Sequence, residues 1–81
     1  MQVHLSELRK LHAEMESART AARQASELLM CALSSYLRGE GQGPTSDEML
    51  ALQAANAREE AALTAYLVCL YALARSRQAT S

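Results

Sequence analysis

The apolar and small residues in the first half of the chain recur at helical spacing. They fall alternately three and four residues apart without a break, as the a and d positions of a coiled coil do. This spacing predicts one long helix from about Leu5 to Arg38, with a seam whose centre is alanine. A second helix can approach such a seam closely. The seam positions are Leu8, Leu11, Met15, Ala18, Ala22, Ala25, Leu29, Ala32 and Tyr36.

A short segment rich in glycine and proline divides the chain. All three glycines and the single proline lie within Gly39–Pro44, so the loop is expected over residues 39–45. Either Gly39 or Gly41 can supply the left-handed cap that ends the first helix. Thr45 and Glu48 have the spacing of a capping box, which predicts a second helix from about residue 46 to about residue 76.

These elements predict an all-α protein of one domain, residues 1–81, folded as an antiparallel two-helix hairpin. The segment 61–74 is apolar nearly all round, and such a helix needs cover on every side. With the loop centred near Gln42, facing residues have numbers that sum to about 85. The apolar segments 28–37 and 61–74 therefore lie at opposite ends of the hairpin and do not meet.

Part of each apolar segment is expected to stay exposed in a monomer. Exposed apolar surface of this kind marks a binding site, and two helices of this size lack a self-sufficient core. We therefore expect the hairpin to complete a four-helix bundle, either as a homodimer or with a helical protein partner. The candidate partner-binding residues are Leu28, Leu29, Leu33, Leu37, Tyr66, Leu67, Leu70, Tyr71 and Leu73.

Charge and hydropathy exclude two classes of partner. The net charge is −1 and the eight basic residues are scattered, which argues against nucleic-acid binding. The apolar run 61–74 is shorter than the roughly 20 residues that span a bilayer, and the N-terminus lacks the pattern of a signal peptide. A cytoplasmic protein without a membrane partner is expected.

The residues that could carry chemistry favour structural roles. Cys31 and Cys69 are too far apart in the hairpin for an intrachain disulfide, and both are expected to be buried thiols, an interchain bond in a dimer being the alternative. His12 and Glu16 lie one helical turn apart, but metal sites need three or four ligands. No nucleophile has a base and an orienting carboxylate nearby, so we do not expect an enzyme. We also expect no metal or other cofactor and no small-molecule ligand.

The chain resembles the small helical-hairpin co-chaperones of type III secretion, which hold needle subunits soluble in the bacterial cytoplasm. The matching features are the overall size, the break at Gly39–Pro44, the Leu-Ala-Leu-Gln-Ala run at 50–54 and the apolar C-terminal turns from Leu70 to Arg75. The resemblance covers residues 44–76 best. It implies binding to a second chaperone and to a needle subunit through helix faces.

Three functions fit these observations. The first is a non-enzymatic interaction module that covers an apolar helical partner, as the type III resemblance implies. The second is a dimeric regulatory antagonist that sequesters a transcription regulator. The third is a self-assembling structural bundle with no other partner.

Overall fold

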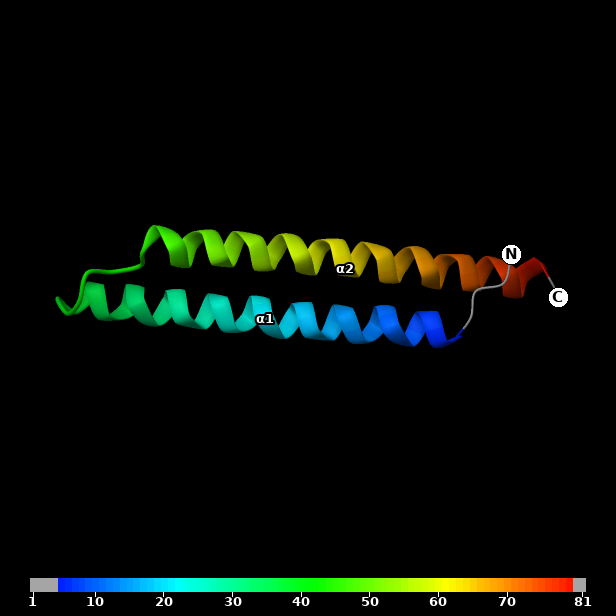
Figure 1. Ribbon diagram of the computed structural model, residues 1–81, viewed down its shortest axis with the longest axis horizontal. Helices are drawn as coiled ribbons and strands as arrows, with labels where there is room; N and C mark the ends of the chain where they lie inside the picture. The colour runs from blue at the N-terminus through cyan, green and yellow to red at the C-terminus, as the bar shows by residue number, and fades with distance from the viewer. Residues whose placement is uncertain (1–4, 80–81) are drawn as a thin grey trace.

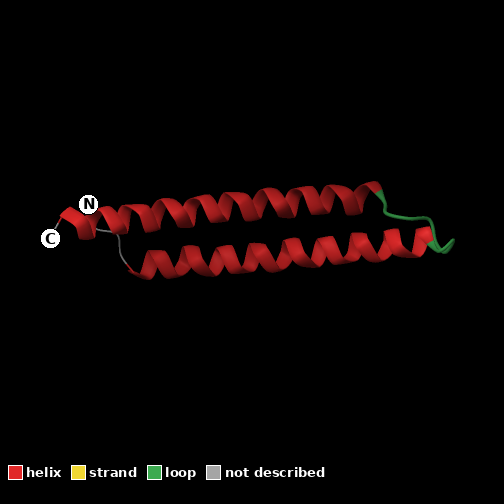
Figure 2. Ribbon diagram, turned by 180° about the vertical axis from the view of Figure 1, so that it is seen from behind, coloured by secondary structure: helices red, strands yellow, loops and turns green. Residues whose placement is uncertain are grey.

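The computed structural model describes residues 5–79, and these form two long antiparallel helices with no strand (Figures 1 and 2). Helix α1 spans Leu5–Leu37 and helix α2 spans Ser46–Ala79, which continues past the expected end at residue 76. The all-helical hairpin prediction is confirmed for these residues. Residues 1–4 and 80–81, which the predicted domain includes, lie outside them.

The molecule is a rod with extents of 63 × 17 × 15 Å. Its radius of gyration is 18.4 Å, against about 12 Å for a compact domain of the same length. A two-helix rod has little interior, and Ala18, Ala22, Ala62 and Cys69 are the buried residues among 5–78. The core is therefore thin and made mainly of alanine.

The predicted a/d seam of α1 faces α2, and all its members from Leu8 to Ala32 are buried or half-buried. Helix α2 has a matching seam with the same alternation of three and four residues. The apolar pattern does not reveal this second seam, because Glu48, Glu59 and Ser76 occupy three of its positions. The seam consists of Glu48, Leu52, Ala55, Glu59, Ala62, Tyr66, Cys69, Leu73 and Ser76.

Helix α1 ends in a Schellman motif. Gly39 has a positive φ of 84° and donates its N–H to the Tyr36 carbonyl at 3.0 Å, while Glu40 donates to the Ser35 carbonyl at 2.8 Å. Of the two glycines that could cap the helix, Gly39 therefore does so. Gly41 and Gly43 also have positive φ, which lets the loop turn back along the end of α1.

This turn shifts the helices relative to the predicted pairing. The loop passes over the Tyr36 ring, so α2 begins short of the level at which α1 ends (Figure 1). His12 and Tyr66, which are in ring contact, have numbers that sum to 78 rather than about 85. The predicted seam position of Tyr36 is consequently wrong, because its side chain lies beyond α2 and is 52% exposed.

Replacing Gly43 with alanine should destabilise the hairpin more than replacing Gly39. Both positions have positive φ, which costs a residue with a Cβ about 1–2 kcal/mol. A Cβ at Gly43 would also lie 3.2 Å from the Tyr36 ring, whereas one at Gly39 would meet nothing within 4 Å. Urea denaturation of the two variants measures the difference. Equal midpoints would show that Tyr36 moves aside without cost.

Helix α2 begins with the predicted capping box, which is confirmed. The Thr45 hydroxyl accepts the Glu48 N–H at 3.1 Å, and the Glu48 carboxylate accepts the Thr45 N–H at 3.0 Å. The Thr45 hydroxyl also donates to the same carboxylate oxygen at 3.0 Å. Asp47 and Glu48 place negative charge at the positive end of the helix dipole.

Replacing Thr45 with alanine should cost about 1 kcal/mol of stability, because the Glu48 N–H loses the hydroxyl oxygen that accepts its hydrogen bond. The neighbouring exposed serine provides the control, and Ser46→Ala should change stability by less than about 0.5 kcal/mol. Thermal melts followed by circular dichroism at 222 nm would compare the two. Matching melts would show that the box contributes nothing to folding.

Candidate partner-binding surface

An apolar surface lies on the side of α2 that faces away from α1. Leu67, Val68 and Tyr71 are 51%, 64% and 69% exposed and form what we name the α2 apolar cluster. Together with Ala72 and Arg75 they line a shallow groove. One-turn spacing from Leu67 to Tyr71 to Arg75 places them on one side of the helix, opposite the buried seam residues.

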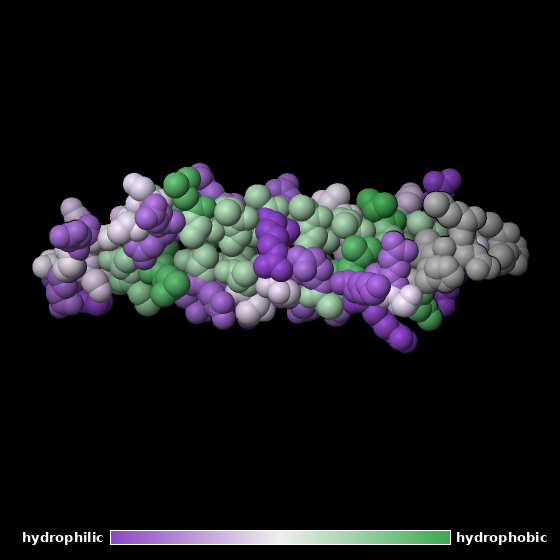
Figure 3. All heavy atoms as spheres, in the orientation of Figure 1, coloured by the Kyte–Doolittle hydropathy of each residue, from purple (hydrophilic) through white to green (hydrophobic). Residues whose placement is uncertain are grey.

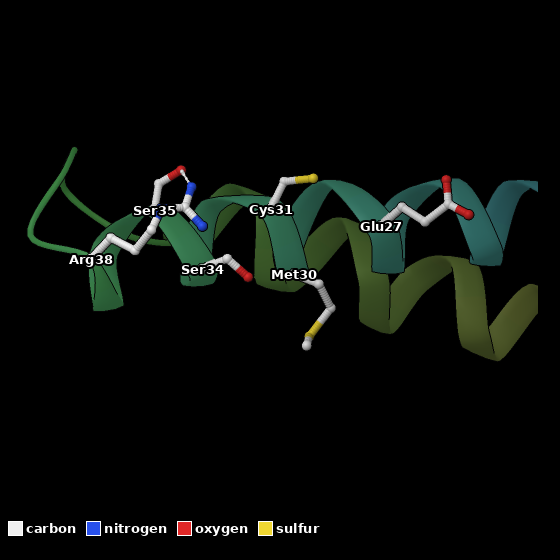
Figure 4. Close-up of a pocket in the computed structure, with 6 residues that line it drawn as sticks. All are labelled: Glu27, Met30, Cys31, Ser34, Ser35 and Arg38. Carbon is white, nitrogen blue, oxygen red and sulfur yellow. Dashed lines mark hydrogen bonds between the residues drawn. The ribbon is translucent and has the colours of Figure 1, made fainter.

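A second apolar cluster lies on α1 towards the loop. Met30 and Leu37, which lie two turns apart on one side of α1, are 53% and 78% exposed, and we name them the α1 apolar cluster. Leu28 is 66% exposed but lies about 200° around the helix from Met30. Met30 also lines a groove with Cys31 and four polar residues, whose side chains all come from α1 (Figure 4). Within it, Arg38 donates to the Ser35 hydroxyl at 3.4 Å. The polar residues of this groove are Glu27, Ser34, Ser35 and Arg38.

The two clusters lie at opposite ends of the rod. We name the end with residues 38–45 the loop end and the other the open end. On the face drawn in Figure 3, the most hydrophobic residues gather towards the two ends of the rod, with paler and polar residues between them. The hairpin thus brings neither cluster into contact with the other, as the pairing argument expects.

The nine candidate binding residues divide into two groups of different exposure. Four are exposed, namely Leu28, Leu37, Leu67 and Tyr71. The other five turn partly towards the opposite helix and are half-buried, which leaves them less area for a partner. These five are Leu29, Leu33, Tyr66, Leu70 and Leu73.

Four further large apolar side chains are exposed in addition to the predicted binding residues. Leu63 is 43% exposed and lies one turn before Leu67 on α2. Met49 and Leu50, in the first turns of α2, are 49% and 60% exposed, and Leu5 is 59% exposed. The predicted binding residues do not include these four. The seam spacing of α2 identifies Leu63, Met49 and Leu50 as lying off its seam.

The prediction that both cysteines are buried is wrong for Cys31. Cys69 is 9% exposed at a seam position, whereas Cys31 is exposed, and both are free thiols. Cys31 follows the seam residue Leu29 by two positions, which turns it about 200° away around the helix. Its apolar neighbours in the sequence therefore say little about its burial.

His12 is engaged with an aromatic side chain. Its ring centroid lies 5.5 Å from that of Tyr66, and its Nε2 lies 3.8 Å from a Glu16 carboxylate oxygen. His12 and Glu16 are both about half exposed. Within residues 5–79 no three histidine, cysteine or carboxylate side chains gather closely enough to hold a metal ion.

An ion pair links the helices near mid-length. The Arg58 guanidinium donates to the Glu14 carboxylate at 2.8 and 2.9 Å and to the Ser17 hydroxyl at 3.3 Å. These bonds join the two helices between the apolar clusters. The site therefore consists of two apolar ends separated by a polar middle.

A double-mutant cycle on Glu14→Ala and Arg58→Ala should give a coupling energy of about 0.2–1 kcal/mol. The side chains are 50% and 45% exposed, so water screens their attraction. The coupling should fall as salt is added. A value well above this range, obtained from urea denaturation of the four proteins, would mean that the pair is far less hydrated than its exposure indicates.

The surface offers apolar area with charges at its edge, which suits burial against another apolar helix. Neither helix of the described chain has an apolar stretch long enough to cross a bilayer. Comparison of the chain with protein families, with curated proteins and with solved structures finds no match.

Proposed function

We propose that this protein is a non-enzymatic interaction module that covers the apolar face of a helical partner protein in the cytoplasm. The observation that carries the proposal is the α2 apolar cluster, in which three large side chains are each more than half exposed. Burying each of them would contribute roughly 1.5–3 kcal/mol to association. A protein with no partner would gain nothing from this surface and would tend to aggregate.

The groove beside the cluster fits a helix. A docked amphipathic helix places side chains at one-turn intervals, which matches the spacing of Leu67, Tyr71 and Arg75. Arg75 at the rim can pair with an acidic residue of the partner without being buried. The apolar centre supplies affinity and the charged edge supplies orientation.

The resemblance to type III secretion co-chaperones narrows the partner to a needle subunit, bound together with a second chaperone. The resemblance implies that such co-chaperones hold these subunits soluble in the bacterial cytoplasm. Helix α2, which carries the groove, is also where the resemblance is strongest. A co-chaperone role would explain why the exposed cluster is kept on a protein this small.

Co-expression with a needle subunit and the chaperone encoded beside it tests this function. We expect a soluble complex of defined mass by light scattering, and a loss of the fluorescence that an apolar dye such as ANS shows with the isolated chain. Tyr71→Asp should prevent the complex, while Gln53→Asp, on the polar half of α2, should not. A chain that stays unbound in the presence of both proteins would refute the co-chaperone role.

A further inference from the structure

The hairpin exposes more surface than its mass requires. It has 6364 Å² of accessible area, whereas a compact protein of 8.8 kDa exposes about 4,800 Å². The surplus is roughly 1,600 Å² per chain. Two chains that buried this surplus against each other would form an interface of about 3,200 Å², within the range of roughly 2,000–5,000 Å² of obligate homodimers.

The distance between the two apolar clusters determines how long a partner must be to cover both of them. They lie towards opposite ends of a rod 63 Å long. A single helix of 20 residues spans about 30 Å and would cover one cluster only. A second copy of the chain has two helices of 33 and 34 residues, which match the rod in length and reach both clusters.

Formal charge is also distributed unevenly along the rod. At the loop end, residues 31–52 carry one basic and three acidic side chains, a net charge of −2. At the open end, residues 5–10 and 69–79 carry four basic side chains and one acidic, a net charge of +3. The loop-end residues are Arg38, Glu40, Asp47 and Glu48, and the open-end residues are Glu7, Arg9, Lys10, Arg75 and Arg77.

We infer that a second copy of this chain packs antiparallel to the first, so that the loop end of each copy lies beside the open end of the other. This orientation brings opposite net charges together at both ends, whereas a parallel dimer would bring like charges together. It also places the α1 apolar cluster of each copy at the level of the α2 apolar cluster of the other. The product is a four-helix bundle with two-fold symmetry.

The inference rests on the proposed function in one respect, because both take the same exposed side chains as binding residues. Here the partner is a second copy of the chain. When no other helical protein is present, the homodimer covers both clusters. The overall net charge of −1 opposes self-association only weakly.

Sedimentation equilibrium of the full chain across a dilution series tests for the dimer. We expect twice the chain mass of 8.8 kDa, with at least tenfold weaker association for Leu67→Asp and no change for Gln53→Asp. A monomer throughout the series overturns the inference. If the monomer still forms a soluble complex with a needle subunit, the proposed function stands without it.

The orientation is tested by a single spin label at the loop tip, on Gln42→Cys in a Cys31→Ser, Cys69→Ala background. In the antiparallel dimer the two labels lie at opposite ends, separated by nearly the 63 Å length of the rod. In a parallel dimer they share one end and lie within about two hairpin widths, each 17 Å. A short distance overturns the antiparallel arrangement. A long distance in a dimer that binds no helical partner would support the inference and refute the proposed function.

Discussion

Changing Leu67 to aspartate should weaken association by at least tenfold while leaving the helices folded. Leu67 belongs to the α2 apolar cluster and is 51% exposed, so the hairpin itself depends little on it. In a complex the side chain would be buried, and the change would remove about 1.5–3 kcal/mol of apolar burial and leave a charge without a partner. Tyr71→Asp should act in the same way. Sedimentation equilibrium measures association, and circular dichroism verifies that the helices remain.

Two control variants show whether the effect belongs to the cluster. Gln53→Asp adds the same charge to an exposed position of α2, outside the apolar run, and should leave association unchanged. Leu11→Ala, within the Leu8–Met15 part of the α1 seam, should lower the melting temperature but affect association less than Leu67→Asp does. If the Leu67 and Tyr71 variants assemble like the native chain, the α2 apolar cluster is not a binding surface.

Changing Ala18 to leucine should destabilise the hairpin by about 1–3 kcal/mol. Ala18 is fully buried between the helices, and a larger side chain there must push them apart or adopt a strained rotamer. The free energy of unfolding of a two-helix domain is only a few kcal/mol. Each 1 kcal/mol of destabilisation lowers the melting temperature of a domain this size by about 4–8 °C. Much of the population should therefore be unfolded well below the native transition.

Ala13→Leu is the matched control, because Ala13 lies on the same helix but is exposed. Alanine and leucine have similar helix propensities, so this variant should melt close to the native chain. Thermal melts of the two variants compare buried and exposed positions directly. A native melting temperature for Ala18→Leu would mean that the helices do not approach closely at the alanine seam.

The fold followed from local sequence signals with strong physical causes. The three-and-four spacing from Leu8 to Ala32 predicted a helix and its inner side, and Thr45 with Glu48 predicted where α2 begins. Each is a short-range pattern that does not depend on the partner helix. The same patterns located the two apolar segments at opposite ends of the rod.

The relative position of the two helices along the rod and the exposure of single residues were not predictable in this way. The relative position of the helices depends on the positive-φ glycines that let the loop pass over Tyr36. Counting residues outward from the centre of the loop cannot predict this path. Cys31 lies in an apolar run but points away from α2, so its exposure follows from its angle around the helix and not from its neighbours. The α2 seam was not predicted from the sequence, because the carboxylate of Glu59 interrupts its apolar pattern.

The elongated shape has a consequence for how the protein behaves in solution. A radius of gyration of 18.4 Å is typical of a compact protein of about 270 residues. A single hairpin will therefore diffuse slowly for its mass and leave a gel-filtration column early, at a volume that globular standards would assign to several copies. A mass taken from the elution volume alone would assign the monomer as an oligomer. Light scattering and sedimentation equilibrium measure the molar mass independently of the shape.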